Sequence, residues 1–167
     1  MTNDEAKLNM SQQIDAAIEA HKKKAEAVHD SLYKAVERSC LLIEGTSKRL
    51  MRDTITNPDI TYWKGKRHNI AHHPSMPYEA PASDTGTMIQ SITHDVTEFG
   101  GFGVIIGRVG STIKDPPYPS YLENGTYKMA PRPWLLPSMT MNQPKIEEII
   151  KAAAAGNIVE VNIDVTD

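Results

Sequence analysis

The sequence has one cysteine, no long apolar run and no large excess of charge of either sign. The single Cys40 among 167 residues excludes an intramolecular disulfide, so folding requires no oxidising compartment. No apolar run approaches the roughly 20 residues that span a bilayer. The first ten residues, MTNDEAKLNM, are too polar for a secretory signal peptide. The sequence therefore predicts a single domain that folds in a reducing compartment and has no membrane partner.

The overall charge argues against a protein whose main task is to bind nucleic acid. Lys and Arg total 18 against 21 Asp and Glu, a net charge of −3, whereas such proteins usually have a strong basic excess. Basic side chains nevertheless outnumber acidic ones between residues 21 and 73, and the flanking regions are acidic. This split favours orientation against other copies or a charged partner, although lysines 22–24 could simply solvate a helix face.

Motifs for catalysis and metal binding are also missing. There is no H-E-x-x-H, CxxC or G-x-S-x-G motif, and the glycines between 101 and 110 miss the G-x-G-x-x-G spacing. His68 and His72 leave a His-dependent metalloenzyme as a minor alternative, but Pro74 argues against a helix that would bring them together. Cys40 lies on the apolar side of an expected helix, where small buried cysteines are common. We therefore expect no enzyme, no metal and no cofactor.

Residues 5 to about 44 are expected to form one long helix. The segment contains no proline, and its first glycine is Gly45, where we expect the helix to end. Apolar or small residues recur at alternating steps of three and four, as on one helical face. This stripe comprises Ile14, Ile18, His21, Ala25, Val28, Leu32 and Ala35.

The length of this helix predicts self-association. Forty residues make a rod of about 60 Å, whereas a compact globule of this size is about 40 Å across. The helix must overhang its domain, bend or lie against a neighbouring subunit. Its partly apolar stripe, above all Ile14, Ile18, Val28 and Leu32, favours a neighbouring copy. The alternative is an N-terminal portion that never orders.

Residues 46–83 are expected to form an extended loop or arm, with a short hairpin near 60–72. Loops of this length are uncommon in compact domains unless they bind something. Basic and aromatic side chains gather here, namely Trp63, Lys64, Lys66 and Arg67. Such a loop suits either DNA, through phosphate contact and stacking, or a protein partner. The acidic whole chain favours protein.

Residues 84–167 are expected to form an α+β core. The expected elements are a short helix capped by Asp84, strands over 93–99 and 104–109, an extended piece over 121–123, a helix that restarts at Pro144 and ends at Gly156, and a strand over 159–165. The last strand has apolar residues at every second position, which is typical of a half-buried strand.

Two segments carry a family resemblance. Residues 73–92, HPSMPYEAPASDTGTMIQSI, and 118–137, YPSYLENGTYKMAPRPWLLP, resemble two signatures of the neck or tail-completion proteins of long-tailed bacteriophages, the group that includes lambda's minor tail protein Z. The second signature is long and ordered, Y-x-x-Y-x-E-x-G-T-x-K-M-x-x-R-P-F-L-x-P. Trp134 replaces its usual Phe, and Tyr78 stands where the first often has Gly. The likeness covers about residues 70–155.

The resemblance implies a virion protein, made in the host cytoplasm, that joins the DNA-filled head to the tail. It implies a small α+β domain in which a long N-terminal helix and one or two shorter helices pack on a small antiparallel sheet. The expected assembly is a homohexameric ring, with a twelve-fold ring as alternative. Its neighbours would be a head-closure or connector protein and a tail terminator or tail tube protein. DNA would pass through the lumen without tight binding, which an acidic wall favours. The alternative function is a DNA-contacting module that grips the genome end through the basic loop at 60–73.

The second signature supplies the candidate interface with other subunits or the tail. Its residues are Tyr121, Glu123, Gly125, Thr126, Lys128, Met129, Arg132, Pro133 and Trp134. Asn124 and Gly125 permit the positive φ of a tight turn. Glu123 and Arg132 flank this turn, and a charge-assisted pair between them would lie within one subunit or between two. The alternative is a purely structural staple between the loop and the following helix.

Overall fold

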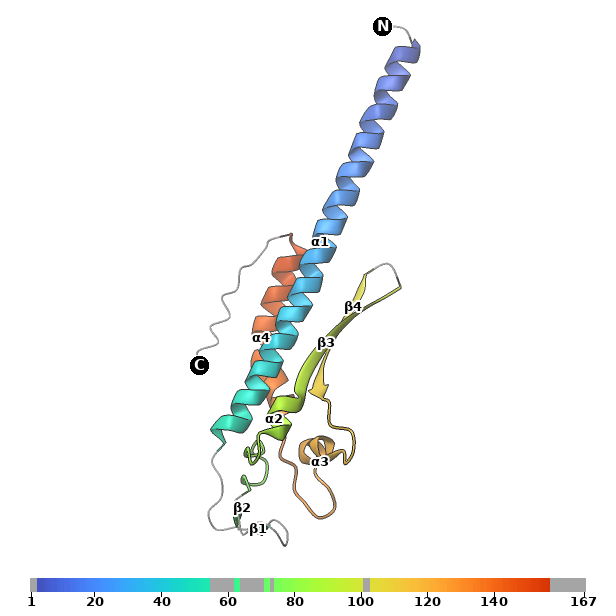
Figure 1. Ribbon diagram of the computed structural model, residues 1–167. Coiled ribbons are helices and arrows are strands. Elements are labelled where there is room, and N and C mark those ends of the chain that lie inside the picture. Colours follow the sequence, from blue (N-terminus) through green and yellow to red (C-terminus); the bar gives the residue numbers. More distant parts are fainter. Residues whose placement is uncertain (1–2, 55–61, 64–70, 73, 101–102, 157–167) are drawn as a thin grey trace.

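The computed structural model describes residues 3–54, 62–63, 71–72, 74–100 and 103–156. The elements are α1 (Asn3–Asp53), β1 (Tyr62–Trp63), β2 (Ala71–His72), α2 (Thr87–Ser91), β3 (Ile92–Phe99), β4 (Val104–Ser111), α3 (Tyr118–Asn124) and α4 (Leu135–Ala154) (Figure 1). The expected α+β class, with a long N-terminal helix, shorter helices and a small antiparallel sheet, is confirmed. No helix in the described part of the chain is long and apolar enough to cross a membrane.

Helix α1 is longer than the sequence pattern predicted. It has 51 residues, which corresponds to about 75 Å, and it continues through Gly45, so the expected end at this glycine is wrong. A glycine inside a helix costs only about 1 kcal/mol. Packing of the next turns outweighs that cost, because Thr46, Ser47 and Met51 are all buried.

Gly45 therefore offers a stabilising substitution. Its backbone is helical, the residue is exposed, and a Cβ built on it would meet no atom within 4 Å. We expect Gly45→Ala to raise the free energy of unfolding by about 0.5–1 kcal/mol, because alanine loses less backbone entropy. Urea unfolding would measure this gain. A loss of stability would contradict this expectation and would mean that another copy packs closely against Gly45.

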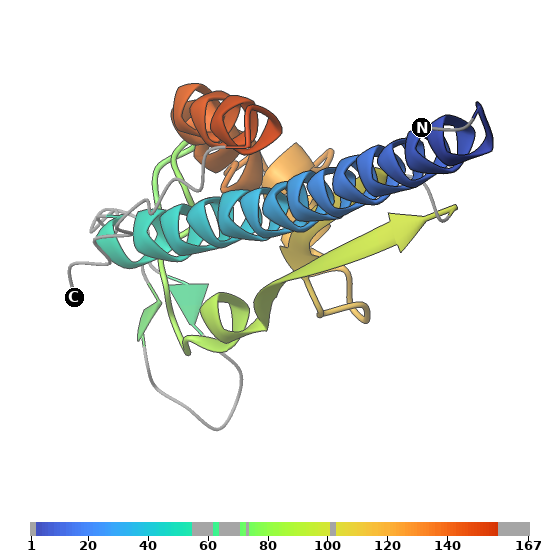
Figure 2. The same ribbon diagram turned by 90° about the horizontal axis from the view of Figure 1, so that it is seen from above.

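The body of the molecule has three layers, with α1 in the middle. Helix α4 lies on one side of α1 and the β3–β4 hairpin on the other (Figures 1 and 2). The α1–α4 contact buries Ala35, Ile149 and Ala153. A second cluster, at the opposite end of α4, joins Met51 to Ile92 of β3 and to Trp134 just before α4, and partly buried apolar side chains surround it.

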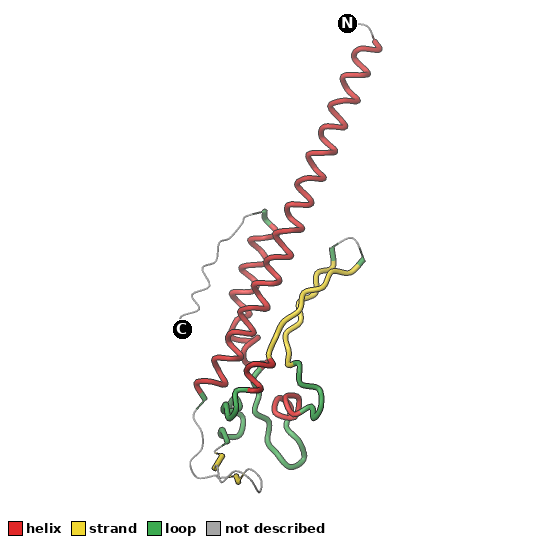
Figure 3. Tube along the Cα trace, in the orientation of Figure 1, coloured by secondary structure: helices red, strands yellow, loops and turns green. Residues whose placement is uncertain are grey.

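The β3–β4 hairpin is the principal sheet (Figure 3). Its strands pair antiparallel from Ile92↔Ser111 to Phe99↔Val104, in agreement with the strands expected over 93–99 and 104–109. Gly107 lets α1 approach the sheet, because a Cβ there would overlap Cys40 Sγ. Cys40 is buried as expected, and burial, followed by the charges of nearby carboxylates, raises the pKa of its thiol. The hairpin expected near 60–72 is present as the short β1–β2 pair.

Several expected boundaries are wrong. The segment over 121–123 is helical, within α3. Helix α2 begins at Thr87 with Gly86 at its N-cap position, so Asp84 does not cap it. Helix α4 does not restart at Pro144 but begins at Leu135 and contains that proline. Pro144 is exposed, so the lost hydrogen bond lies at the solvent side of the helix, where water can replace it. The strand expected over 159–165 lies outside the described residues.

A partly buried ionic cluster fixes the hairpin to α1. His94 Nδ1 of β3 lies 2.6 Å from Glu44 Oε2 of α1, and Lys48 bonds the other carboxylate oxygen. Burial raises the pKa of Glu44, but the hydrogen bonds and charges of Lys48 and His94 outweigh burial, and the net pKa lies below the ordinary value of 4.5.

This lowered pKa predicts acid sensitivity. The Glu44 contribution to stability is present above pH 4.5, its pKa when unfolded, and is lost as pH falls through its lower folded pKa. We expect Glu44→Gln to flatten the decline of the free energy of unfolding below about pH 4.5. Chemical denaturation at a series of pH values would measure the two slopes. Parallel slopes for wild type and variant would contradict this assignment.

Candidate functional site

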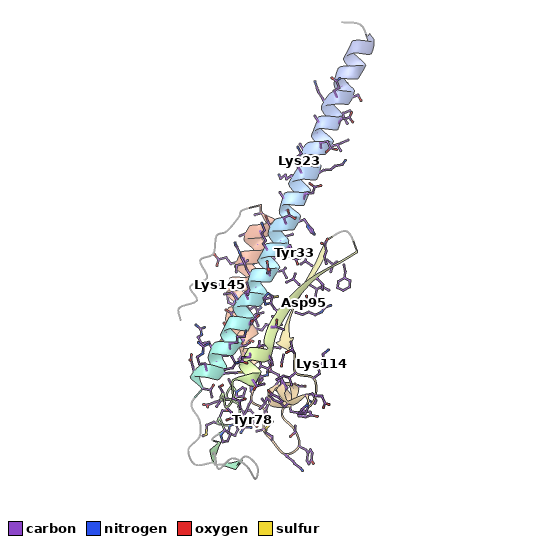
Figure 4. The ribbon with its side chains drawn as sticks, viewed as in Figure 1. Lys23, Tyr33, Tyr78, Asp95, Lys114 and Lys145 are labelled. Atoms are coloured by element: carbon purple, nitrogen blue, oxygen red, sulfur yellow. The ribbon has the colours of Figure 1, made fainter. Side chains whose placement is uncertain are left out.

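The two signature-like segments, whose first residues are 45 positions apart in sequence, meet at one end of the molecule. The Tyr78 backbone N–H donates to the Pro131 carbonyl at 2.8 Å. The guanidinium of Arg132 donates from Nε and Nη2 to the Ser75 carbonyl, each at 3.3 Å. Tyr78 lies at the end opposite the projecting half of α1 (Figure 4). The segments that carry the resemblance thus form one structural unit.

Glu123 links α3 to α4 in this unit. Its carboxylate accepts the backbone N–H groups of Trp134 at 2.8 Å and of Leu135 and Leu136 at 2.9 Å each. The first N–H groups of a helix have no partner within the helix and form the positive end of its dipole. Glu123 therefore caps α4 from a different helix, 11 residues earlier in the chain.

The expected pair between Glu123 and Arg132 is not formed within the described chain. Glu123 accepts the three N–H groups of α4, and the Arg132 side chain bonds the Ser75 carbonyl instead. The backbone N–H of Arg132 also donates to the Leu122 carbonyl at 2.6 Å. The alternative of a loop-to-helix staple therefore describes the geometry, but with different partners from those expected.

The turn after α3 requires glycine at position 125. Gly125 has φ 74° and ψ 178°, a region that side chains very rarely enter. Thr126 and Met129 then close a short bridge through two backbone hydrogen bonds. A Cβ at Gly125 would lie 2.9 Å from the Met129 carbonyl oxygen and from the Pro131 nitrogen. The predicted positive φ at Asn124-Gly125 is confirmed.

Gly125→Ala should therefore be costly. We expect it to lower the free energy of unfolding by about 2–3 kcal/mol, since backbone strain and contact with fixed backbone atoms add. Gly100→Ala is the matched control, because Gly100 has φ 78° but open space around its Cβ position. Thermal and urea unfolding of both variants would compare them. Equal losses would show that contact with the backbone adds nothing at Gly125.

The nine candidate interface residues divide into exposed and internal ones. Tyr121, Thr126 and Lys128 are exposed, so they are available to a partner. Gly125, Met129 and Pro133 are half-buried, as are Glu123 and Arg132 with their internal partners. Trp134 is 3% exposed, and its indole N–H donates to the Pro119 carbonyl at 3.2 Å. Trp134 thus packs in the core of the chain, whereas the prediction for it was an apolar contact at an interface.

The signature missed a highly exposed residue of this turn. Tyr127 is 92% exposed, and Lys128 Nζ lies 5.0 Å from the centroid of its ring. The signature leaves position 127 unspecified, so only the presence of an aromatic residue at the tip of a turn could have indicated it. Exposed tyrosines are frequent anchors in protein interfaces.

A groove of about 590 Å³ lies between the two segments and next to this turn. Its lining includes Pro77, Pro81, Met88, Leu122, Met129 and Arg132. Tyr118 also lines it, and burial raises the pKa of the Tyr118 hydroxyl. The lining is mostly apolar.

Across the described residues, no group of three or more His, Cys, Asp or Glu side chains could hold a metal ion.

The second candidate surface is the exposed half of α1, which projects beyond the body (Figure 1). All side chains from 10 to 27 are exposed, and we call this segment the α1 arm. Ile14 is 53% and Ile18 47% exposed. Val28 is half-buried, and Leu32 packs against the α1–α4 core cluster. Of the four residues predicted for self-association, Ile14 and Ile18 are therefore exposed, whereas Val28 and Leu32 are partly covered by the rest of the chain.

The apolar stripe of the arm is continuous with the buried face of α1. Met10, Ile14 and Ile18 are spaced by four residues, and Val28 and Leu32 continue the same side of the helix. The sequence analysis did not include Met10, which is 64% exposed. The face that α4 covers in the body thus continues uncovered along the arm.

The loop that is predicted to contact DNA or a partner protein lies largely outside the described residues. Lys64, Lys66 and Arg67 lie outside the described residues, and only the backbone of Trp63 is described, in β1.

No protein-family model matches the chain, and no curated protein or solved structure is significantly similar to it.

Proposed function

We propose that this chain is a structural protein of the bacteriophage neck that assembles into a ring and joins the head to the tail. The observation that carries the proposal is the apolar stripe of α1, which is partly buried in the body and exposed along the α1 arm. An amphipathic helix gains most of its stability from packing its apolar face. The exposed half of α1 therefore needs a partner.

Other copies of the chain are the partners that fit best. Fully burying an isoleucine or methionine side chain contributes about 1.5–3 kcal/mol, so the three large apolar side chains of each arm supply several kcal/mol per contact. An arm that reaches beyond its own body makes a head-to-tail contact with the next copy, and such contacts close into rings when the rotation allows. Six-fold symmetry is the expected closure, with a twelve-fold ring as the alternative.

The structural unit formed by the two signature-like segments supports the assignment to the phage neck. The two segments that resemble neck and tail-completion signatures meet through Arg132, Ser75, Tyr78 and Pro131. Tyr121 of α3 and Tyr127 of the following turn are exposed, and α3 lies at the end of the molecule away from the arm (Figure 1). We assign this end to contact with a head-closure or connector protein or with the tail terminator or tube. The net negative charge suits a lumen that releases DNA instead of holding it.

The test is to remove the chain from the phage or prophage that encodes it. We expect filled heads and finished tails that stay unjoined, and electron microscopy of complemented particles should locate a tagged copy as a ring between head and tail. Joined, infectious particles in the absence of the chain would overturn the proposal. Salt-dependent binding of duplex DNA that is lost in Lys64→Ala/Lys66→Ala/Arg67→Ala would instead favour the DNA-contacting alternative.

A further inference from the structure

One edge of the principal sheet has no partner among the described residues. Strands β3 and β4 form a two-stranded sheet, and Thr112 N–H donates to the Ser91 carbonyl at 2.9 Å. Hydrogen-bonded and non-hydrogen-bonded pairs alternate in an antiparallel ladder. Because Thr112 and Ser91 form a hydrogen-bonded pair, every second residue of β4 before Thr112 also bonds β3. The backbone N–H and C=O groups of the residues between them, Ile105, Gly107 and Val109, therefore point away from β3. We call these groups the β4 edge.

The opposite edge, along β3, is less suited to a further strand. The hydroxyl of Tyr33 on α1 donates to the Val96 carbonyl at 3.5 Å, so α1 already supplies a partner there. Strand β3 also carries Asp95 and Glu98, whereas the charged residue of β4 is Arg108, whose Nη1 lies 3.7 Å from Asp95 Oδ2. An acidic segment would therefore favour the β4 edge.

The C-terminal segment of the chain has the length, pattern and charge to occupy such an edge. Residues 158–165, IVEVNIDV, alternate apolar and polar side chains over eight positions, and β4 also has eight residues. Glu160 and Asp164 make the segment acidic. A two-stranded ribbon is only marginally stable in water, and an added strand gains main-chain hydrogen bonds along its length.

The reach of the chain favours the β4 edge of a neighbouring copy over that of the same copy. Helix α4 ends at Ala154, on the side of α1 opposite the hairpin (Figure 2). Packed helices lie 8–10 Å apart and the sheet lies a similar distance beyond α1, so the span is roughly 20 Å. Residues 155–157 bridge at most about 14 Å between Ala154 and residue 158. A neighbouring copy is therefore the better acceptor.

We propose that residues 158–165 add as a third strand to the β4 edge of the neighbouring copy, so that each subunit of the ring donates its C-terminal strand to the next. This inference rests on the proposed ring, and it names the backbone groups through which adjacent subunits join. It also explains why a long, apolar strand edge is left open in a single copy, which would otherwise invite aggregation.

The test compares two full-length variants by residue-resolved hydrogen exchange. Val161→Pro/Ile163→Pro removes two backbone donors from the segment, whereas Val161→Thr/Ile163→Thr keeps them together with β propensity. We expect the amides of Ile105, Gly107 and Val109 to exchange at least tenfold faster in the proline variant than in wild type. The amides of Ile106 and Arg108, which bond β3, serve as internal controls. Unchanged exchange of the β4 edge, or equal acceleration in both variants, would overturn the proposal.

A mixing experiment identifies the donor. Isotope-labelled proline variant is combined with unlabelled wild-type chain, and protection should return to the labelled β4 edge if the strand comes from another copy. Failure to transfer protection would overturn donation between copies. Native mass spectrometry separates this inference from the proposed function. A ring mass without protection overturns only the strand, whereas a single-copy mass overturns both.

Discussion

Replacing both Ile14 and Ile18 by aspartate is expected to weaken assembly at least 100-fold and leave the fold of the body intact. Both side chains are about half exposed in a single copy and belong to the apolar stripe of the α1 arm. Contact with a neighbour would bury them, and the variant would then bury two carboxylates without partners. Sedimentation velocity would report the loss of assembly, and circular dichroism the retained helix.

The opposite face of the arm provides the control. Gln12 and Ala16 are also exposed, and Gln12→Asp/Ala16→Asp adds the same charge to the same stretch of the arm but away from the stripe. This control should assemble like wild type. If both double variants lost assembly equally, added charge and not the stripe would be responsible, and the proposed contact would be wrong.

Removing the Glu123 carboxylate should produce a large loss of stability. Glu123→Ala leaves three N–H groups at the start of α4 without their acceptor. We expect the free energy of unfolding to fall by about 2–3 kcal/mol, more than for an ordinary N-cap, because one side chain serves three donors. The connection to the buried Trp134 would loosen with it.

The size of this effect is open to direct measurement. Urea unfolding of Glu123→Ala and Glu123→Gln would give the two losses, and the glutamine variant should lose less because it keeps one acceptor oxygen. Arg132→Ala would show whether the bonds to the Ser75 carbonyl act independently of the cap. A loss below about 0.5 kcal/mol in Glu123→Ala would contradict the capping role, since that is the range of ordinary surface substitutions.

Patterns that depend on neighbouring residues were predictable. The 3–4 spacing predicted α1, and the strands expected on either side of the glycines at 100–103 match β3 and β4 to within two residues. The prediction that α1 is too long for its own body needed only helix rise and domain size. The end at Gly45 was wrong because burial of Met51 outweighs local propensity, which no nearby residue reveals.

Features that depend on distant contacts were not predictable. The resemblance drew attention to Glu123 and Arg132, but their charges suggested a mutual pair. In the structure each side chain has a backbone partner instead. The start of α4 comes close to Glu123, and the Ser75 carbonyl comes close to Arg132, only when the chain folds. For α3 a signal was available but missed, since Pro119 stands in its first turn, where proline favours a helix.

The covering of the α1 arm by other copies can be tested most directly by thiol accessibility. Ile18→Cys places a thiol on the stripe and Lys23→Cys places one on the opposite face, while the native Cys40 is buried with a raised pKa and reacts slowly. In dilute monomer both introduced thiols should react alike. At assembly concentrations, the thiol at position 18 should react at least tenfold more slowly than the thiol at position 23. Equal rates at every concentration, with head and tail proteins present, would contradict the account.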